Sequence, residues 1–144
     1  MAGLMSLLAL EGAWRLERRI VHSDDSEFKF EGEARFARSG KRLIHDEEGL
    51  LSGVPGQEPI RATRRYIWMR EGDRIEVHFH DMRPFHTIPM GAEAPETTYL
   101  CSPDRYRVSY DFSDMKAWRA TWKVEGPKKS YVMESLYRPD DGKR

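Results

Sequence analysis

The chain has 144 residues, which is enough for a single domain with a complete hydrophobic core. Its 24 lysine and arginine residues equal its 24 aspartate and glutamate residues, so the formal net charge is zero and a nucleic-acid-binding protein is not expected. Cys101 is the only cysteine, which rules out an intramolecular disulfide and a multi-cysteine zinc site and favours a cytoplasmic location.

The N-terminal segment from Gly3 to Leu10 is apolar but short. It lacks the basic start and the small-residue cleavage site of a signal peptide, and it is too short to span a membrane. We expect this segment to form a helical turn or short lid that plugs one end of the domain, and we expect no membrane partner.

Alternating apolar and charged residues run along most of the chain. Trp14, Leu16 and Ile20, for example, alternate with Arg15 and Arg19. This period of two is typical of strands with one buried and one exposed face. Eight or nine strands are predicted, and the clearest cover residues 13–22, 27–38, 43–51, 60–69, 74–85, 105–112, 117–124 and 130–138.

Short strands joined by hairpins predict an all-β fold, a single closed antiparallel up-and-down β-barrel, because closure removes the exposed strand edges. Residues 87–97 hold two prolines, a glycine and two glutamates, so they are predicted to form a mobile loop over the mouth of the barrel. We expect residues 1–139 to form the domain and residues 140–144 to be a frayed tail.

Several polar side chains fall on the face of these strands that should be buried. A buried charge without a partner is strongly unfavourable, so an inward set of charges predicts a polar cavity. Extending the alternation along each strand places these residues inside: Arg18, His45, Glu47, Arg64, Tyr66, Asp81, Arg83, Tyr106 and Tyr110.

Three inward arginines against two inward carboxylates predict a site for a small ligand with an anionic or carbonyl head group, because guanidinium groups bind such groups well. Arg18, Arg64 and Arg83 would hold the head. The partly hydrophobic body would lie against aromatic side chains, among them Tyr66, Trp68, Phe85, Tyr106 and Tyr110, with Phe79, Trp118 and Trp122 as further apolar walls.

Two alternatives stay open. His45 with Glu47 or Asp81 could transfer protons in a cofactor-free isomerase, cyclase or dehydratase, although His45 could equally serve only as a hydrogen-bond donor. In the other alternative, Arg18 and Arg83 form ion pairs with the two carboxylates inside a filled barrel, and the protein is an interaction module. The oligomeric state is left open, with a homodimer as one option.

Histidines 78, 80 and 86 raise the question of a metal site. His78 and His80 share one strand face, but the alternation places that face outside, and a catalytic zinc ion needs three close protein ligands. We predict no metal and no cofactor; a haem is possible in some barrels of this type, but no residue specifically indicates one.

The start of the first strand, Gly12-Ala13-Trp14, resembles the G-x-W signature of lipocalin-like (calycin) barrels. The resemblance implies that Trp14 packs across the closed end of the barrel, and that a basic residue of the last strand, here Arg138, covers its ring. It also implies a lipocalin-like form of the predicted barrel.

Most of the chain is similar to an uncharacterised bacterial and fungal family of lipocalin-like domains. The matching stretches are Leu10–Trp14 with Arg18, Glu47–Gly49, Arg65–Trp68, Asp81–His86, Cys101–Tyr106 and Trp122–Lys129. Met82 stands where this family is expected to have glycine, and Tyr99 lies near an expected histidine. The resemblance implies a fold and no activity.

Overall fold

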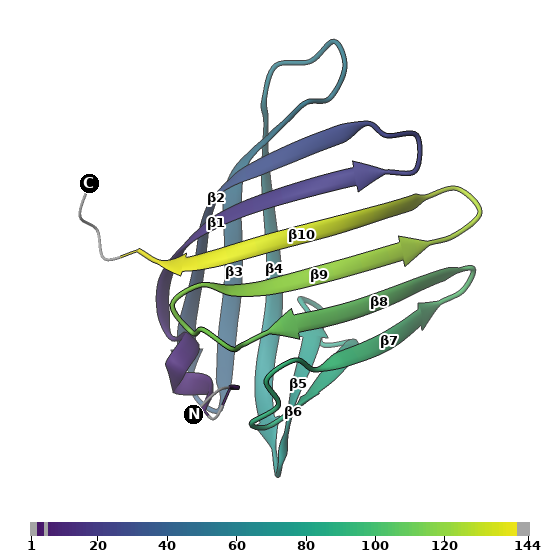
Figure 1. The fold of residues 1–144 in the computed structure, drawn as a ribbon. Coiled ribbons are helices and arrows are strands. Elements are labelled where there is room, and N and C mark those ends of the chain that lie inside the picture. Colours follow the sequence, from purple (N-terminus) through teal and green to yellow (C-terminus); the bar gives the residue numbers. More distant parts are fainter. Residues whose placement is uncertain (1–2, 5, 141–144) are drawn as a thin grey trace.

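The computed structural model describes residues 3–4 and 6–140. The ten strands among them form one continuous antiparallel sheet (Figure 1). A short 3-10 helix, η1 (Leu7–Leu10), precedes the sheet. The ten strands are β1 (Gly12–His22), β2 (Glu27–Ser39), β3 (Arg42–Ser52), β4 (Ile60–Glu71), β5 (Arg74–Phe79), β6 (Pro84–Pro89), β7 (Glu96–Cys101), β8 (Asp104–Asp111), β9 (Trp118–Glu125) and β10 (Ser130–Pro139).

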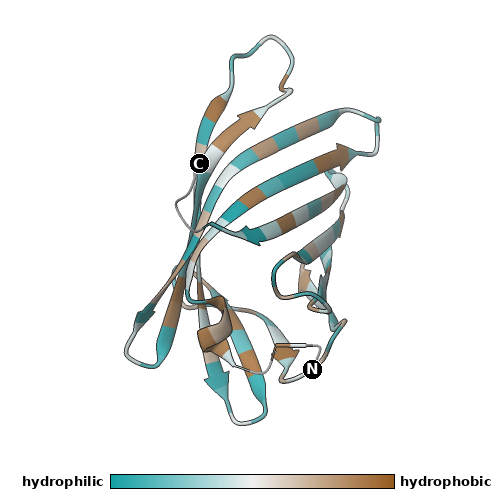
Figure 2. Ribbon diagram, turned by 60° about the vertical axis from the view of Figure 1, so that its left-hand side comes forward, coloured by the Kyte–Doolittle hydropathy of each residue, from teal (hydrophilic) through white to brown (hydrophobic). Residues whose placement is uncertain are grey.

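Hydropathy alternates along the strands, as the sequence predicts (Figure 2). In β1 the side chains of Trp14, Leu16 and Arg18 are buried, whereas Arg15 and Glu17 are exposed. The inner face is therefore the apolar one, and the core consists mainly of aromatic and large aliphatic side chains from every part of the sheet.

The strand order is β6-β5-β4-β3-β2-β1-β10-β9-β8-β7, an up-and-down meander in which β10 returns to pair with β1. The sheet curls until β6 and β7 lie beside each other, but no backbone pairing joins these two strands in the described residues. The barrel is thus nearly closed, not closed as predicted. Proline at both ends of β6, Pro84 and Pro89, removes ladder donors from this edge, and the rings of Phe85 and Tyr99 meet across the seam at 5.2 Å.

The predicted strand over residues 74–85 is two strands. Phe79 and Arg83 close a tight turn, in which the Phe79 amide donates to the Arg83 carbonyl at 2.9 Å. The second strand, β6, then continues through residues 84–89, so part of the predicted loop over residues 87–97 is strand, and β7 begins at Glu96. The aspartate at position 81 and the proline at position 84 are turn-forming residues that interrupt the alternation.

The N-terminal segment is a single 3-10 turn, and a helical lid is not observed in its described residues. Leu4 and Leu10 are nevertheless fully buried, and the Trp14 indole N–H donates to the Leu10 carbonyl at 2.8 Å. Trp14 is buried and packs edge-on against Trp118, with 5.8 Å between the ring centres.

Arg138 does not cover the Trp14 ring as the resemblance implied. It lies opposite Arg15 in the β1–β10 register and forms an ion pair with Glu17 at 3.5 Å, on the outer face. Its neighbour Tyr137 points inward instead and stacks on Trp118 at 3.9 Å. In the predicted tail, the Asp140 amide donates to the Ala13 carbonyl at 2.9 Å, and residues 141–144 lie outside the described residues.

Met82 lies in the turn between β5 and β6 with a φ of 70°, in the left-handed region that favours glycine. This geometry explains why glycine is expected at that position.

Met82→Gly should therefore raise the free energy of unfolding by about 1 kcal/mol, measured by urea denaturation. Met82→Ala, which keeps a Cβ atom, should bring no such gain; an equal gain in both variants would contradict backbone strain as the cause.

Candidate functional site

A buried ion pair joins β1 to β3 in the middle of the barrel. Arg18 Nη1 lies 2.9 Å from Glu47 Oε1, and Arg18 Nη2 donates to Glu47 Oε2 at 3.1 Å. Arg18 is 8% exposed and Glu47 is 2% exposed. Because both charges are almost out of water, their mutual neutralisation decides how the interior is organised.

The strand between these two residues leaves room for the pair. Arg18 lies opposite Phe30 of β2, and Glu47 lies opposite Ala34. Gly32 lies between Phe30 and Ala34 on the same face, where a Cβ atom would collide with the backbone of β3. The Arg18 side chain can therefore cross β2 over small residues to reach Glu47, with its guanidinium carbon 5.3 Å from the centre of the Phe30 ring.

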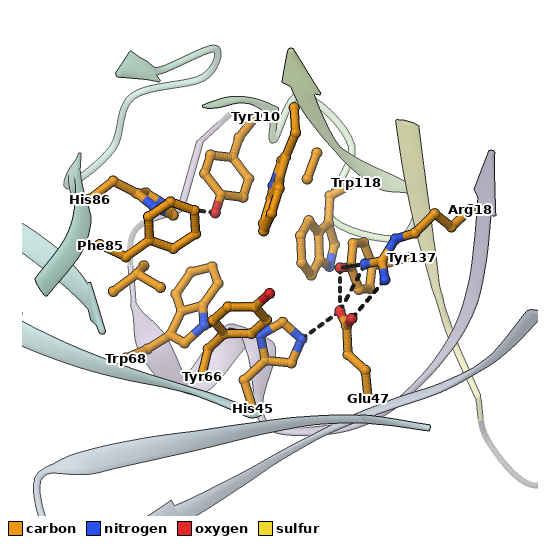
Figure 3. Close-up of a pocket in the computed structure, with 13 residues that line it drawn as sticks. Arg18, His45, Glu47, Tyr66, Trp68, Phe85, His86, Tyr110, Trp118 and Tyr137 are labelled. Carbon is orange, nitrogen blue, oxygen red and sulfur yellow. Dashed lines mark hydrogen bonds and ion pairs between the residues drawn. The ribbon is translucent and has the colours of Figure 1, made fainter. Parts of the chain in front are cut away.

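Two residues of β10 complete the partners of Arg18. Its Nε donates to Ser135 Oγ at 2.7 Å, and its Nη2 also lies 3.2 Å from the Tyr137 hydroxyl. Tyr137 in turn donates to Glu47 Oε2 at 2.7 Å. All nitrogens of the Arg18 guanidinium thus have protein partners within the barrel. Figure 3 shows those that Glu47 and Tyr137 provide.

His45 is fixed by a hydrogen bond at each ring nitrogen. The Trp68 indole, which can only donate, donates to His45 Nδ1 at 3.1 Å. Nδ1 is therefore the unprotonated nitrogen, and Nε2 carries the hydrogen that faces Glu47 Oε2 at 3.0 Å. His45 also stacks on Phe36 at 4.1 Å. In this arrangement His45 donates to Glu47 and accepts from Trp68.

Glu47 is ionised. Burial alone would raise the pKa of its carboxyl, but the Arg18 charge and the hydrogen bonds from His45 and Arg18 hold that pKa well below its usual range. Burial likewise opposes the charge on Arg18, and the Glu47 carboxylate overcomes this effect, so the pKa of Arg18 is raised. The pair is a neutralised unit and leaves the interior without a free positive charge among its described residues.

Next to this pair lies a cavity of about 20 Å³, space for roughly one water molecule. Most of the barrel interior is filled by side chains, as the filled-barrel alternative expects. Thirteen residues line the cavity: Arg18, His45, Glu47, Tyr66, Trp68, Val77, Phe85, His86, Tyr110, Trp118, Ala120, Trp122 and Tyr137.

Two residues of the cavity wall carry buried nitrogens that have no hydrogen-bond partner among the described residues, His86 Nδ1 and Trp118 Nε1. His86 Nε2 lies 2.7 Å from the Tyr110 hydroxyl. Burial lowers the pKa of His86 to about 3 and raises the pKa of Tyr110, so both side chains are neutral at pH 7. The wall is polar but uncharged on this side.

Arg64 lies beside the cavity, in contact with two of its wall residues, Tyr66 and Trp122. It is exposed, its Nη1 donates to the Tyr66 hydroxyl at 3.3 Å, and its guanidinium carbon lies 5.9 Å from the centre of the Trp122 ring. It forms no ion pair with any described carboxylate. The Tyr106 hydroxyl accepts from Lys129 at 2.9 Å.

The inward placement predicted for Asp81 and Arg83 is wrong. Both lie in the turn between β5 and β6, where Arg83 Nε donates to Asp81 Oδ2 at 2.6 Å. The Arg83 side chain is 74% exposed. The alternation placed them inside only because it was extended across this turn. The structure therefore brings His45 and Glu47 together but does not add Asp81 to them.

His78 is also placed differently from the prediction. It is 9% exposed, not on an open surface, and its nitrogens face Glu76 and the Met82 carbonyl. In residues 3–4 and 6–140, no group of three or more His, Cys, Asp or Glu side chains is arranged to hold a metal ion. Over the same residues, no helix is long and apolar enough to cross a membrane.

Sequence reasoning missed several residues of the site. Ser135 and Tyr137 satisfy Arg18, and His86 pairs with Tyr110. Tyr137 and Ser135 share the inward parity of β10 with Met133, so the alternation could have found them. His86 could not be placed in this way, because the pairing of β5 with β6 shifts register between Val77 and His78.

The fold and the site together place this protein among nearly closed antiparallel β-barrels, here with a buried ion pair inside. The chain belongs to the family of unknown function DUF6314, whose pattern matches residues 10–139. No curated protein matches the chain.

Among solved structures, the S-type phycobiliprotein lyase CPES from Guillardia theta is similar, with a TM-score of 0.64 and 9% identity, over 94% of this chain and 91% of that one. A de novo designed fluorescence-activating β-barrel matches with a TM-score of 0.49 and 14% identity, over 95% and 99% of the two chains. At these identities the likeness concerns the fold alone.

Removing the Glu47 charge should strongly destabilise the protein, because Arg18 would be left as an uncompensated buried cation. We expect Glu47→Gln to lower the free energy of unfolding by about 3–5 kcal/mol in urea denaturation. The control is Glu48→Gln, which removes an exposed partner of Arg61 and should change stability by less than about 1 kcal/mol. Equal effects of the two substitutions would contradict the importance of the buried pair.

His86 should make stability depend on pH. In the unfolded chain His86 binds a proton below its ordinary pKa of 6.5, whereas in the folded protein it stays neutral until the pH approaches its lowered pKa of about 3. The free energy of unfolding should therefore fall by about 1.4 kcal/mol per pH unit below pH 6.5 from this group. Urea denaturation between about pH 4.5 and 6.5 would show a shallower dependence in His86→Gln, and an unchanged one in the exposed control His80→Gln.

Proposed function

We propose that this barrel binds a small, partly hydrophobic molecule with an anionic or carbonyl head group. The observation that carries the proposal is Arg64, a cation beside the cavity that forms no ion pair with the described carboxylates. A guanidinium that forms no ion pair among the described residues and lies at the edge of an aromatic pocket suits a carboxylate, a phosphate or a carbonyl oxygen.

Of the three arginines proposed from the sequence, Arg64 alone takes the head group. Arg18 is neutralised by Glu47, and Arg83 is paired with Asp81 on the outside. Tyr66 supports Arg64, because its hydroxyl accepts from the guanidinium and can donate its own proton onward. Burial raises the pKa of Tyr66, so this proton is present at pH 7.

The body of the ligand would lie on the aromatic side of the cavity, against Tyr66, Phe85 and Trp122. Since the cavity volume is only about 20 Å³, a larger molecule binds at the outer part of the pocket or displaces aromatic side chains. The same small volume favours the second candidate function, a filled barrel that acts as a protein-interaction module.

Native mass spectrometry of the protein purified from its own organism separates the two functions. Under the binding proposal, the native mass exceeds the denatured mass by that of a small molecule. Once this molecule is identified, Arg64→Gln should weaken its binding about tenfold or more in calorimetry, because a charge-assisted hydrogen bond is lost. Arg61→Gln, on the same strand but paired with Glu48, should bind normally.

A native mass equal to that of the bare chain would contradict tight binding and favour the filled barrel. An identified ligand whose affinity is the same in the protein and in Arg64→Gln would contradict the role of Arg64.

A further inference from the structure

Six aromatic side chains gather where Arg64 lies, and they define a mouth cluster: Tyr66, Phe79, Phe85, Tyr99, Tyr106 and Trp122. Neighbouring ring centres lie between 4.5 Å for Phe79 and Phe85 and 6.4 Å for Tyr66 and Phe79. Five of the six are half-buried, and only Phe85 is buried. The cluster therefore offers ring faces and edges to solvent at one end of the barrel.

Behind the mouth cluster the interior is closed. The cavity of about 20 Å³ ends against Trp68, Tyr110 and Trp118, which belong to the packed core. A flexible aliphatic chain needs depth to bury its length, and this interior gives none. A flat ring can instead lie against the half-exposed aromatic faces without entering the core, and aromatic pairs favour offset-stacked or edge-to-face contacts at these spacings.

The cations beside the mouth cluster differ in whether a carboxylate pairs with them. Lys129 lies 5.3 Å from the Tyr106 ring centre but is paired with Asp104 at 3.2 Å, and Arg83 near Phe79 is paired with Asp81. Arg64 has no such carboxylate partner among the described residues, and it lies over Trp122. The anionic group of a ligand should thus lie at the Arg64 and Tyr66 side of the cluster.

We propose that the mouth cluster binds a planar aromatic carboxylate, with its ring against the half-buried Trp122 and Tyr66 and its carboxylate on the Arg64 guanidinium and the Tyr66 hydroxyl. The proposal rests on the binding function above and specifies the ligand class: flat, aromatic and anionic. Tight binding is not expected for aliphatic acids, because the cavity that the described residues enclose is only about 20 Å³. It is not expected for neutral aromatic amides either, because they bring no anion to Arg64.

Three probes test this on the full chain by isothermal titration calorimetry: 2-naphthoate, its neutral analogue 2-naphthamide, and decanoate. We expect 2-naphthoate to bind at least about tenfold more tightly than either of the others, since one charge-assisted hydrogen bond contributes on that order. Arg64→Gln should weaken 2-naphthoate about tenfold and 2-naphthamide much less, because the amide oxygen carries no charge, whereas Arg61→Gln should change neither.

Two substitutions of Trp122 test the contact between this side chain and the ring of the ligand. Trp122→Leu should weaken 2-naphthoate severalfold, and Trp122→Phe should retain most of the affinity because a flat face remains. Circular dichroism checks that each variant is folded. If Trp122→Leu is unfolded, intermolecular NOEs between 2-naphthoate and the Trp122 indole in the unchanged protein test the same contact, and their absence under saturating ligand overturns it.

The outcomes separate this inference from the proposed function. Equal, Arg64-dependent binding of decanoate and 2-naphthoate would overturn the aromatic specificity and leave the binding function standing. Equal binding of 2-naphthamide and 2-naphthoate would overturn the anionic part of the inference. If none of the probes binds while the purified protein retains a different ligand, the inference fails alone; if no ligand is retained either, both fail.

Discussion

The buried Arg18–Glu47 pair is the constraint on which the rest of the interior depends. Two charges with exposures of 8% and 2% can remain inside only if nearly every donor and acceptor is satisfied. Ser135 and Tyr137 from β10 and His45 from β3 meet this demand. Three strands that are distant in sequence are thereby held in one register, because a shift of one residue would turn each of these side chains outward.

The neutralised Arg18–Glu47 pair also bears on where an anionic ligand group could meet a positive charge. A neutralised pair at the centre, beside the uncharged His86 and Tyr110, leaves the described interior without a free cation. Arg64, which is exposed and forms no ion pair with a described carboxylate, lies at the edge of the cavity, where its guanidinium donates to Tyr66. Under the proposed function, stability and binding would use different residues, so substitutions at the mouth would change affinity while the central network keeps the barrel folded.

The sequence predicts the meander well because most strands keep a strict alternation, and β1, β2 and β3 fall within a residue or two of their predicted bounds. The inward placement of Arg18, His45 and Glu47 follows from the same regularity. It fails at Asp81 and Arg83 because a tight turn ends the alternation there. Hydrogen-bond partners such as Trp68 for His45 depend on tertiary geometry, which alternation does not contain.

The same geometry bears on the choice between binding and acid–base catalysis. A proton-transfer site needs a group that can change its protonation near neutral pH within reach of a ligand. Glu47 is held ionised by Arg18, both nitrogens of His45 are engaged, and burial lowers the pKa of His86 to about 3, which keeps its ring neutral. The surroundings of Glu47 and His86 hold each of these two groups in one protonation state at pH 7. Under the binding proposal, donors and acceptors that keep one protonation state would present constant partners to a ligand.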